Sequence, residues 1–264
     1  MNLVIVQARL GSKRFPNKVL SPLGESTILD FLVGQIQKAK NVDKIVIATT
    51  QESIDDSLVE HCLLKNYELF KGSELDLLDR HYQCTKKYKP TSISKIPSDV
   101  PFVDPKIIDE VIKRFFAEDF DYVSNLHPPT YPDGLDVETF SFESLETAWE
   151  NAGKGYEREH TTPYIWDNTD KFKIGSVTSD QKKNYFMNYR WTIDYKKDLE
   201  FMQKVHKYFI VDNPHFRWFE LVEFLDNNPS IASINKKYNG VNWYGKHIDD
   251  LKTFDESMTT IRKK

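Results

Sequence analysis

The chain has 264 residues, of which 39% are hydrophobic and 13% are aromatic, and its formal net charge at pH 7 is −4. This length can bury a full hydrophobic core in one α/β domain. A net negative charge argues against a general nucleic-acid binder, which needs a broad basic surface.

The sequence predicts a cytoplasmic protein without a membrane partner. No stretch approaches the roughly 18 uninterrupted apolar residues of a membrane span. The first expected strand begins at Leu3, which leaves no room for a charged leader and an apolar signal core. Cys62 and Cys84 fall in expected helices, and their spacing suits neither a disulfide scaffold nor a metal site.

Residues 1–125 alternate short apolar runs with amphipathic segments, a pattern typical of βαβ units and a mostly parallel sheet. The expected strands are Leu3–Gln7, Lys44–Thr49, Tyr67–Phe70, Ser92–Ile96 and Tyr122–Ser124. The expected helices between them are Ile28–Lys38, Ile54–Lys65, Leu75–Tyr88 and Pro105–Phe116.

Prolines and Gly134 interrupt this pattern at 128–134, and the order of elements then changes. The expected strands beyond are Val137–Phe140, Lys173–Thr178 and Asn188–Ile193. The expected helices are Glu143–Asn151, Arg158–Trp166, Lys197–Tyr208 and Phe216–Leu225. Residues 234–264 have weak periodicity, so we expect an irregular tail or a segment that packs on a partner subunit.

The loop after the first strand is densely cationic. It reads Arg9-Leu10-Gly11-Ser12-Lys13-Arg14-Phe15-Pro16-Asn17-Lys18, and no acidic residue occurs before Glu25. In an open α/β sheet this loop borders the ligand crevice. Gly11 and Ser12 allow a tight turn with exposed backbone N–H groups, and the cations can neutralise a polyphosphate. A solvated basic loop is the alternative, but the position favours an anion site.

The loop matches neither a Walker loop nor a dinucleotide fingerprint. The pattern Gln7-Ala8-Arg9-x-Gly11-Ser12-x-Arg14-x-Pro16-x-Lys18 instead resembles the signature of sugar nucleotidyltransferases. It is most similar to the cytidylyltransferase group of the acylneuraminate and KDO synthetases and the SpsF-like spore-coat polysaccharide proteins. The resemblance covers about residues 3 to 235.

The resemblance implies a single Rossmann-like three-layer α/β domain with a mostly parallel mixed sheet, of the nucleotide-diphospho-sugar transferase type. This domain would span 1–233, with a nucleotide-binding half at 1–125, an acceptor-binding half at 126–233 that also forms a homodimer, and the irregular tail at 234–264.

The resemblance also implies the residues that hold CTP. Asp79-Arg80 matches the family's D-V-L-D-R stretch, so Arg80 faces the nucleotide or else pairs with Asp76 one turn away. Arg9, Arg14 and Lys18 would act in catalysis by clamping the triphosphate. The implied nucleotide-binding residues are Gln7, Ala8, Arg9, Leu10, Gly11, Ser12, Arg14, Lys18, Thr49, Arg80 and Ser98.

Two aspartates are candidate ligands for Mg²⁺, which binds one or two carboxylates together with phosphate oxygens. Asp99 lies in the loop after an expected strand, at the same edge of the sheet as the basic loop. Its segment resembles the family's G-D-x-P-x-x-D-P stretch, although Pro97 and Ser98 replace threonine and glycine. Asp194 resembles the first aspartate of the family's T-x-D-x-x-x-D-L ending; helix capping is its alternative role. We expect Asp104 to cap the next helix, and Asp198 to stabilise a helix N-terminus.

The acceptor side resembles the SpsF-like D-Y-V-S-N, Y-P-x-G-L-D-x-E and R-E-H-x-T-P-Y stretches, at 121–125, 131–138 and 158–164. A buried polar network or an interface ion pair is the alternative for the last of these. The implied acceptor-binding residues are Asn125, Tyr131, Asp136, Glu138, Arg158, Glu159 and His160.

These features predict Mg²⁺-dependent transfer of CMP from CTP to a sugar acid or sugar-like acceptor, with release of pyrophosphate, in the synthesis of surface-polysaccharide or glycoconjugate precursors. A glycosyltransferase that uses a nucleotide sugar is one alternative; it would normally show a D-x-D motif, whereas the 98–101 segment has one acid. A nucleotide-binding scaffold without activity is the other.

Overall fold

The computed structural model describes residues 1–179 and 184–260. Its centre is a seven-stranded sheet in the order β5-β4-β1-β6-β8-β7-β9. Strands β5, β4, β1 and β6 run parallel, β8 is antiparallel to both of its neighbours, and β9 is parallel to β7. The strands are β1 Asn2–Gln7, β4 Lys44–Thr50, β5 Glu68–Gly72, β6 Ser92–Pro97, β7 Tyr122–Ser124, β8 Glu138–Phe140 and β9 Ile174–Ser176.

Both faces of the sheet are covered, which explains why residues 3–6 of the central strand β1 are continuously apolar rather than alternating. In β1, Leu3 and Ile5 enter one buried cluster while Val4 and Val6 enter the other. The predicted mixed, mostly parallel three-layer α/β fold is confirmed.

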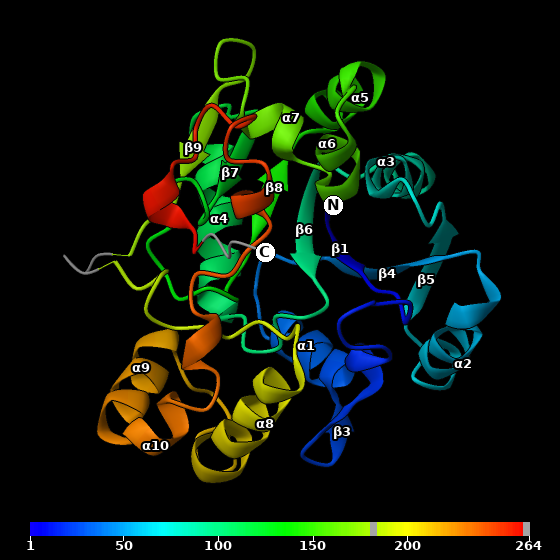
Figure 1. Ribbon diagram of the computed structural model, residues 1–264. Coiled ribbons are helices and arrows are strands. Elements are labelled where there is room, and N and C mark those ends of the chain that lie inside the picture. Colours follow the sequence, from blue (N-terminus) through cyan, green and yellow to red (C-terminus); the bar gives the residue numbers. More distant parts are fainter. Residues whose placement is uncertain (180–183, 261–264) are drawn as a thin grey trace.

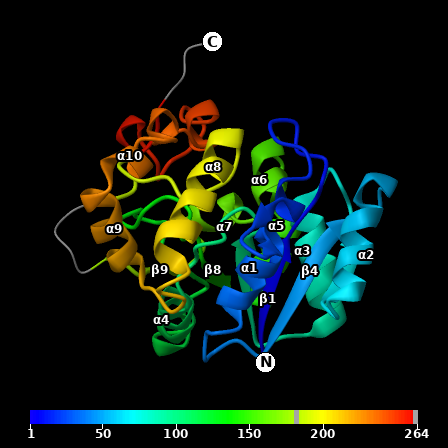
Figure 2. The ribbon, with the colours of Figure 1, turned by 90° about the horizontal axis from the view of Figure 1, so that it is seen from below.

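One face carries the helices that pack with Val4 and Val6. Figure 1 shows α8, α9 and α10 grouped at one side of the molecule, and Figure 2 shows α8 beside α1. The helices of this face are α1 Ile28–Ile36, α2 Asp56–Leu64, α4 Pro105–Ala117, α8 Lys196–Val205, α9 Trp218–Asn227 and α10 Pro229–Ala232.

The other face carries α3, α5, α6 and α7, which contact one another and pack on Leu3 and Ile5. Figure 1 shows α3, α5 and α6 together. These helices are α3 Leu77–Tyr88, α5 Phe142–Asn151, α6 Gly155–His160 and α7 Pro163–Trp166. The sequence predicted a single helix in place of α6 and α7. Thr161 has a positive φ of 73°, which ends α6, and Pro163 begins α7 as a separate helix.

The remaining elements are short. A hairpin joins β2 Pro22–Leu23 to β3 Ser26–Thr27, and a π-helical turn at His206–Ile210 follows α8. The 3₁₀ turns are Lys18–Leu20, Ser53–Asp55, Lys236–Tyr238, Tyr244–Lys246 and Glu256–Met258. Residues 234–260 therefore form irregular structure with short turns, and Tyr244, Leu251 and Phe254 pack into the cluster of Leu3 and Ile5. Among the described residues, no helix is long and apolar enough to cross a membrane.

The predicted strand Asn188–Ile193 is wrong. Arg190 makes one isolated bridge to Asp133, and the chain then turns so that the Ile193 amide donates to the Asp99 carbonyl, 3.0 Å away. The segment therefore links two loops instead of following a single neighbouring strand, and no ladder of hydrogen bonds forms. Its apolar pattern reflects burial, since Trp191 and Ile193 are fully buried.

Candidate functional site: a cationic loop facing two aspartates

The candidate site lies where the parallel strands end. Because β1, β4, β5 and β6 are parallel, the loops that leave their carboxyl ends share one edge of the sheet. The antiparallel strand β8 begins at the same edge, since Glu138 lies opposite Lys95 in the register. The basic loop 9–18, the loop that carries Asp99 and the segment before β8 therefore meet there.

The basic loop is folded by its own backbone and by one aspartate. The Leu10 carbonyl accepts from the amides of Ser12 and Asn17, at 2.9 and 3.1 Å. The buried Asp55 accepts from the Leu10 amide at 2.6 Å with one oxygen and from the Thr50 hydroxyl with the other. Asp55 thus attaches the loop to the end of β4. No sequence motif marks Asp55, so it was not among the predicted site residues.

Lys18 connects the two predicted metal ligands. Its Nζ atom lies 2.7 Å from Oδ2 of Asp99 and 3.2 Å from Oδ1 of Asp194, and it also donates to the Ile193 carbonyl at 2.5 Å. Burial alone would lower the pKa of Lys18, but the two carboxylates outweigh it and raise the pKa. Asp99 and Asp194, 95 positions apart, therefore share one ammonium group.

Arg14 and Arg190 complete the surroundings of Asp194. Arg14 donates to Oδ1 at 2.5 Å and Arg190 donates to Oδ2 at 2.8 Å. Burial would raise the pKa of Asp194, but Lys18, Arg14 and Arg190 lower it to about 2. Asp194 does not cap α8, because Tyr195 is the N-cap residue and Asp198 accepts from the amides of Asp194 and Tyr195. The predicted role of Asp198 at this helix N-terminus is confirmed.

Asp104 caps α4, as predicted. Its Oδ1 accepts from the Lys106 amide at 2.8 Å, and its other oxygen binds Arg217. It therefore lies outside the group of carboxylates around Lys18.

The predicted nucleotide-binding residues at the strand ends include polar atoms that lack partners. Oε1 of Gln7 and Oγ1 of Thr49 are buried without a hydrogen-bond partner among the described residues. Gln7 pairs with Ala48 in the register, so these two side chains belong to neighbouring strand ends. Unpaired buried polar atoms are rare in folded proteins. Ser98 is buried at the end of β6, next to Asp99.

Arg80 and Arg9 lie at the β4 side of the same edge. The buried guanidinium of Arg80 donates to the carbonyls of Ser73, Glu74 and Ala48. Burial and then the charge of Arg9 lower the pKa of Arg80 to about 10. Arg80 does not pair with Asp76, whose carboxylate binds Arg158 at 2.6 Å. Arg9 makes a loose, half-exposed pair with Glu74 at 3.7 Å.

The predicted acceptor residues divide into groups with different surroundings. Asp136 lies at the site: burial and then the charges of Asp99 and Glu138 raise its pKa to about 7. Gly134, with a φ of +107°, brings this loop against the backbone of Trp191, where a Cβ atom would collide. His160 stacks on Trp243 with ring centroids 3.9 Å apart, and burial lowers its pKa to about 3.

In the structure, three other predicted acceptor residues make contacts that connect neighbouring segments of the fold. The side-chain amide of Asn125 donates to the Leu135 carbonyl and accepts from the Val137 amide. Tyr131 packs edge-on against Trp218. Arg158 joins α6 to α3 and α5, because it binds Asp76 and the Trp149 carbonyl. The next residue, Glu159, is exposed.

Glu138 belongs to a buried polar cluster between the sheet and α7. Lys95 donates to its Oε1 at 2.5 Å, and Tyr122 and Thr162 donate to its Oε2. Burial raises the pKa of Glu138, but Lys95 and these hydrogen bonds lower it overall. Lys95 was not among the predicted site residues; its only signal in the sequence is a charged residue in the middle of an expected strand, which the structure shows to be buried.

Comparison with known proteins identifies the class. The structure superposes on a cytidylyltransferase from Leptospira borgpetersenii with a TM-score of 0.81 and 32% identity, covering 88% of this chain and 96% of that one. CMP:2-keto-3-deoxy-manno-octonic acid synthetase shares the fold, with a TM-score of 0.59 and 11% identity, over 78% of this chain and 98% of that one. The fold is thus that of the Rossmann-like nucleotidyltransferases.

The sequence comparisons then give the family. The model of the cytidylyltransferase family matches residues 3–228. The spore coat polysaccharide biosynthesis protein SpsF of Bacillus subtilis is 32% identical over 88% of this chain and 96% of its own length. Protein MJ1063 of Methanocaldococcus jannaschii is 39% identical over 88% and 93% of the two chains. The chain belongs to the cytidylyltransferase family.

Proposed function

We propose that the protein transfers CMP from CTP to a sugar acid or sugar-like acceptor, with release of pyrophosphate, for surface-polysaccharide or glycoconjugate precursors. The observation that carries this proposal is the convergence of Lys18 and Arg14, from the basic loop, on Asp99 and Asp194. The membership of the cytidylyltransferase family supports CTP as the donor. SpsF, by its name a spore coat polysaccharide protein, supports the pathway class.

Asp99 and Asp194 would hold a Mg²⁺ ion. Among the described residues, no group of three or more His, Cys, Asp or Glu side chains could hold a metal ion. Mg²⁺ does not need such a cage, because it binds one or two carboxylates and completes its shell with phosphate oxygens and water. Since both carboxylates reach one ammonium group, they lie within two hydrogen-bond lengths of each other, and the donor set fits. The bound ion would polarise the α-phosphoryl group.

The residues of the chain would position and neutralise the triphosphate. The acceptor oxygen attacks the α-phosphorus, and the bond from this phosphorus to the oxygen of the departing pyrophosphate breaks. The acceptor hydroxyl loses its proton to solvent. Arg9, Arg14 and Lys18 would offset the charge that grows on the pyrophosphate, so no covalent protein nucleophile is required. Asp136 and His160 would line the acceptor side.

We also propose a homodimer formed through residues 126–233 and a cytoplasmic location. The cysteines Cys62 and Cys84 are free and buried, which is typical of proteins in a reducing compartment. Light scattering on the purified protein tests the oligomeric state.

The direct test is pyrophosphate release with each NTP against a panel of sugar acids, sugar phosphates and phosphonates. CTP with one acceptor class should release pyrophosphate. Transfer from a nucleotide sugar without pyrophosphate release would instead identify a glycosyltransferase. Binding of CTP and Mg²⁺ without turnover across the panel would identify a scaffold without activity.

A further inference from the structure

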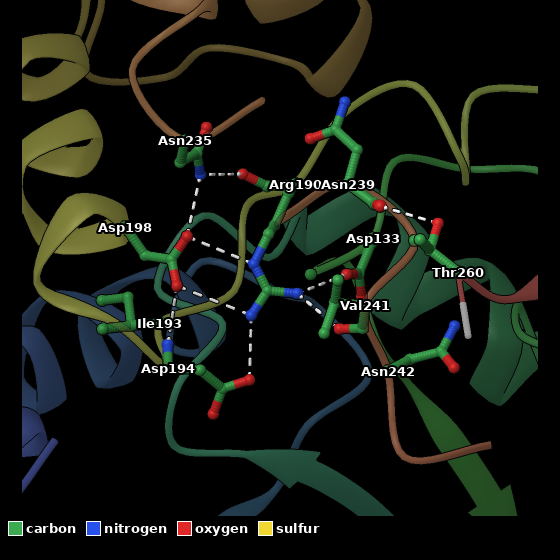
Figure 3. Close-up of polar contacts among 12 residues, drawn as sticks. Asp133, Arg190, Ile193, Asp194, Asp198, Asn235, Asn239, Val241, Asn242 and Thr260 are labelled. Carbon is green, nitrogen blue, oxygen red and sulfur yellow. Dashed lines mark hydrogen bonds and ion pairs between the residues drawn. The ribbon is translucent and has the colours of Figure 1, made fainter. Parts of the chain in front are cut away.

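The guanidinium group of Arg190 orients the Asp194 carboxylate, and other residues hold this guanidinium in place. Nη2 of Arg190 donates to Oδ2 of Asp194 at 2.8 Å, Nη1 donates to Asp133 at 3.3 Å, and Nε donates to Asp198 at 3.1 Å. Figure 3 shows this guanidinium surrounded by the three carboxylates. Because Arg190 takes Oδ2, the other oxygen of Asp194 is directed at Arg14 and Lys18.

Two residues near the C-terminal end, Asn235 and Val241, hold Arg190 in place. The Val241 carbonyl accepts from Nη1 of Arg190 at 2.9 Å. The amide of Asn235, only 2% exposed, donates to the Arg190 carbonyl at 2.9 Å and to Oδ1 of Asp198 at 3.0 Å (Figure 3). Asp198 in turn accepts from the amides of Asp194 and Tyr195. The amide of Asn235 therefore ties together the residues on both sides of Asp194.

We propose that the segment Asn235–Val241 is a positioning element of the carboxylate site, acting through Arg190 and Asp198 on Asp194. The segment lies beyond residues 3–228, which the family model matches. Groups that orient a metal ligand contribute strongly although they do not touch the metal. The importance of Asp194 for catalysis, and with it this inference, rests on the proposed function.

The test compares Asn235→Ala with Asn242→Ala. Asn242 lies directly after this segment and is a matched control, because its amide also makes two hydrogen bonds, with the Met258 carbonyl and the Thr259 hydroxyl. Hydrogen exchange of peptides that cover 190–198 is measured without any ligand. Pyrophosphate release from CTP is then measured against Mg²⁺ concentration. Asn235→Leu, which keeps nearly the same shape and removes the donor without adding a charge beside Asp198, serves as a second variant should Asn235→Ala fail to fold.

Loss of the Asn235 amide should speed exchange at the amides of Asp194 and Tyr195 and raise the Mg²⁺ concentration for half-maximal rate about 10-fold or more. Asn242→Ala should change neither quantity. Unchanged exchange in the Asn235 variants, or equal effects of Asn235→Ala and Asn242→Ala, would overturn the inference. Absence of turnover in the wild-type protein would instead contradict the proposed function, because the exchange measurement needs no nucleotide.

Discussion

The Nζ atom of Lys18 lies 2.7 Å from Oδ2 of Asp99, across 81 positions of sequence. The same ammonium group contacts Asp194, so a cation from the basic loop joins both predicted metal ligands. Since burial of an unpaired charge is costly, each of these groups depends on the others.

Replacement of Lys18 should abolish most of the activity. Lys18→Met keeps the apolar stem but removes the charge that would neutralise the triphosphate, so we expect pyrophosphate release to fall by on the order of 100-fold. Steady-state kinetics with CTP measure the effect. Lys13→Met, which removes an exposed cation from the same loop, is the matched control and should leave turnover unchanged. An equal loss in both variants would show that only the total charge of the loop matters.

The anchor of the basic loop should matter for both stability and nucleotide binding. Asp55→Ala leaves the Leu10 amide and the Thr50 hydroxyl without their acceptor, which should lower the free energy of unfolding by about 1–3 kcal/mol. It should also raise the KM for CTP, because the loop is no longer fixed. Urea denaturation and kinetics test both effects. Asp56→Ala, at an exposed neighbouring position, should stay within about 0.5 kcal/mol; a similar loss there would contradict the anchor.

Loss of one partner of the buried pair Lys95 and Glu138 should lower the free energy of unfolding far more than loss of both. Lys95→Met leaves Glu138 charged and buried without its cation, and we expect a loss of about 3–5 kcal/mol in the free energy of unfolding. The double variant with Glu138→Gln should recover part of this loss, because no buried charge remains. Urea denaturation of the single and double variants measures the difference. Additive losses would contradict a coupled pair.

Acid should destabilise the protein through His81. This fully buried ring is bound to the Leu77 carbonyl, and burial lowers its pKa to about 3. The unfolded chain, with a pKa near 6.5, therefore binds more protons, and stability falls as the pH drops from 6.5 toward 3. At pH 5 this linkage amounts to about 2 kcal/mol.

His81→Asn keeps a donor near the Leu77 carbonyl and removes the titrating ring. The fall in unfolding free energy between pH 7.5 and pH 5 should therefore be about 2 kcal/mol smaller than in the wild type. Chemical denaturation at the two pH values measures it. His215→Asn, at an exposed site, is the control. An unchanged pH dependence in His81→Asn would show that His81 is not the source.

The fold was predictable because its signals are local. The apolar run of β1 marks a strand buried on both faces, and the Asp104 cap together with the periodicity of α4 marks a helix. The same signals failed at Asn188–Ile193, because apolar residues that join two loops have the composition of a buried strand. Burial was visible in the sequence, but hydrogen-bond partners were not.

The candidate site was predictable where a family motif marks the residue, as for Lys18, Asp99 and Asp194. It was not predictable for Asp55, Lys95 and Asn235, because these act on neighbours that only the tertiary structure brings close. Arg190, Asp194 and Asp198 have a regular spacing of four, yet the first two of them lie before helix α8. Such spacing predicts a helix face and gives no sign of a shared guanidinium.

The most direct test of the proposed site is calorimetric titration of CTP into the wild type, Asp99→Asn and Asp194→Asn, each with and without Mg²⁺. We expect Mg²⁺ to strengthen CTP binding by the wild type and to have no such effect on either variant, while circular dichroism shows that both variants are folded. Equal strengthening by Mg²⁺ in all three proteins would contradict the assignment of these aspartates as the shared metal ligands.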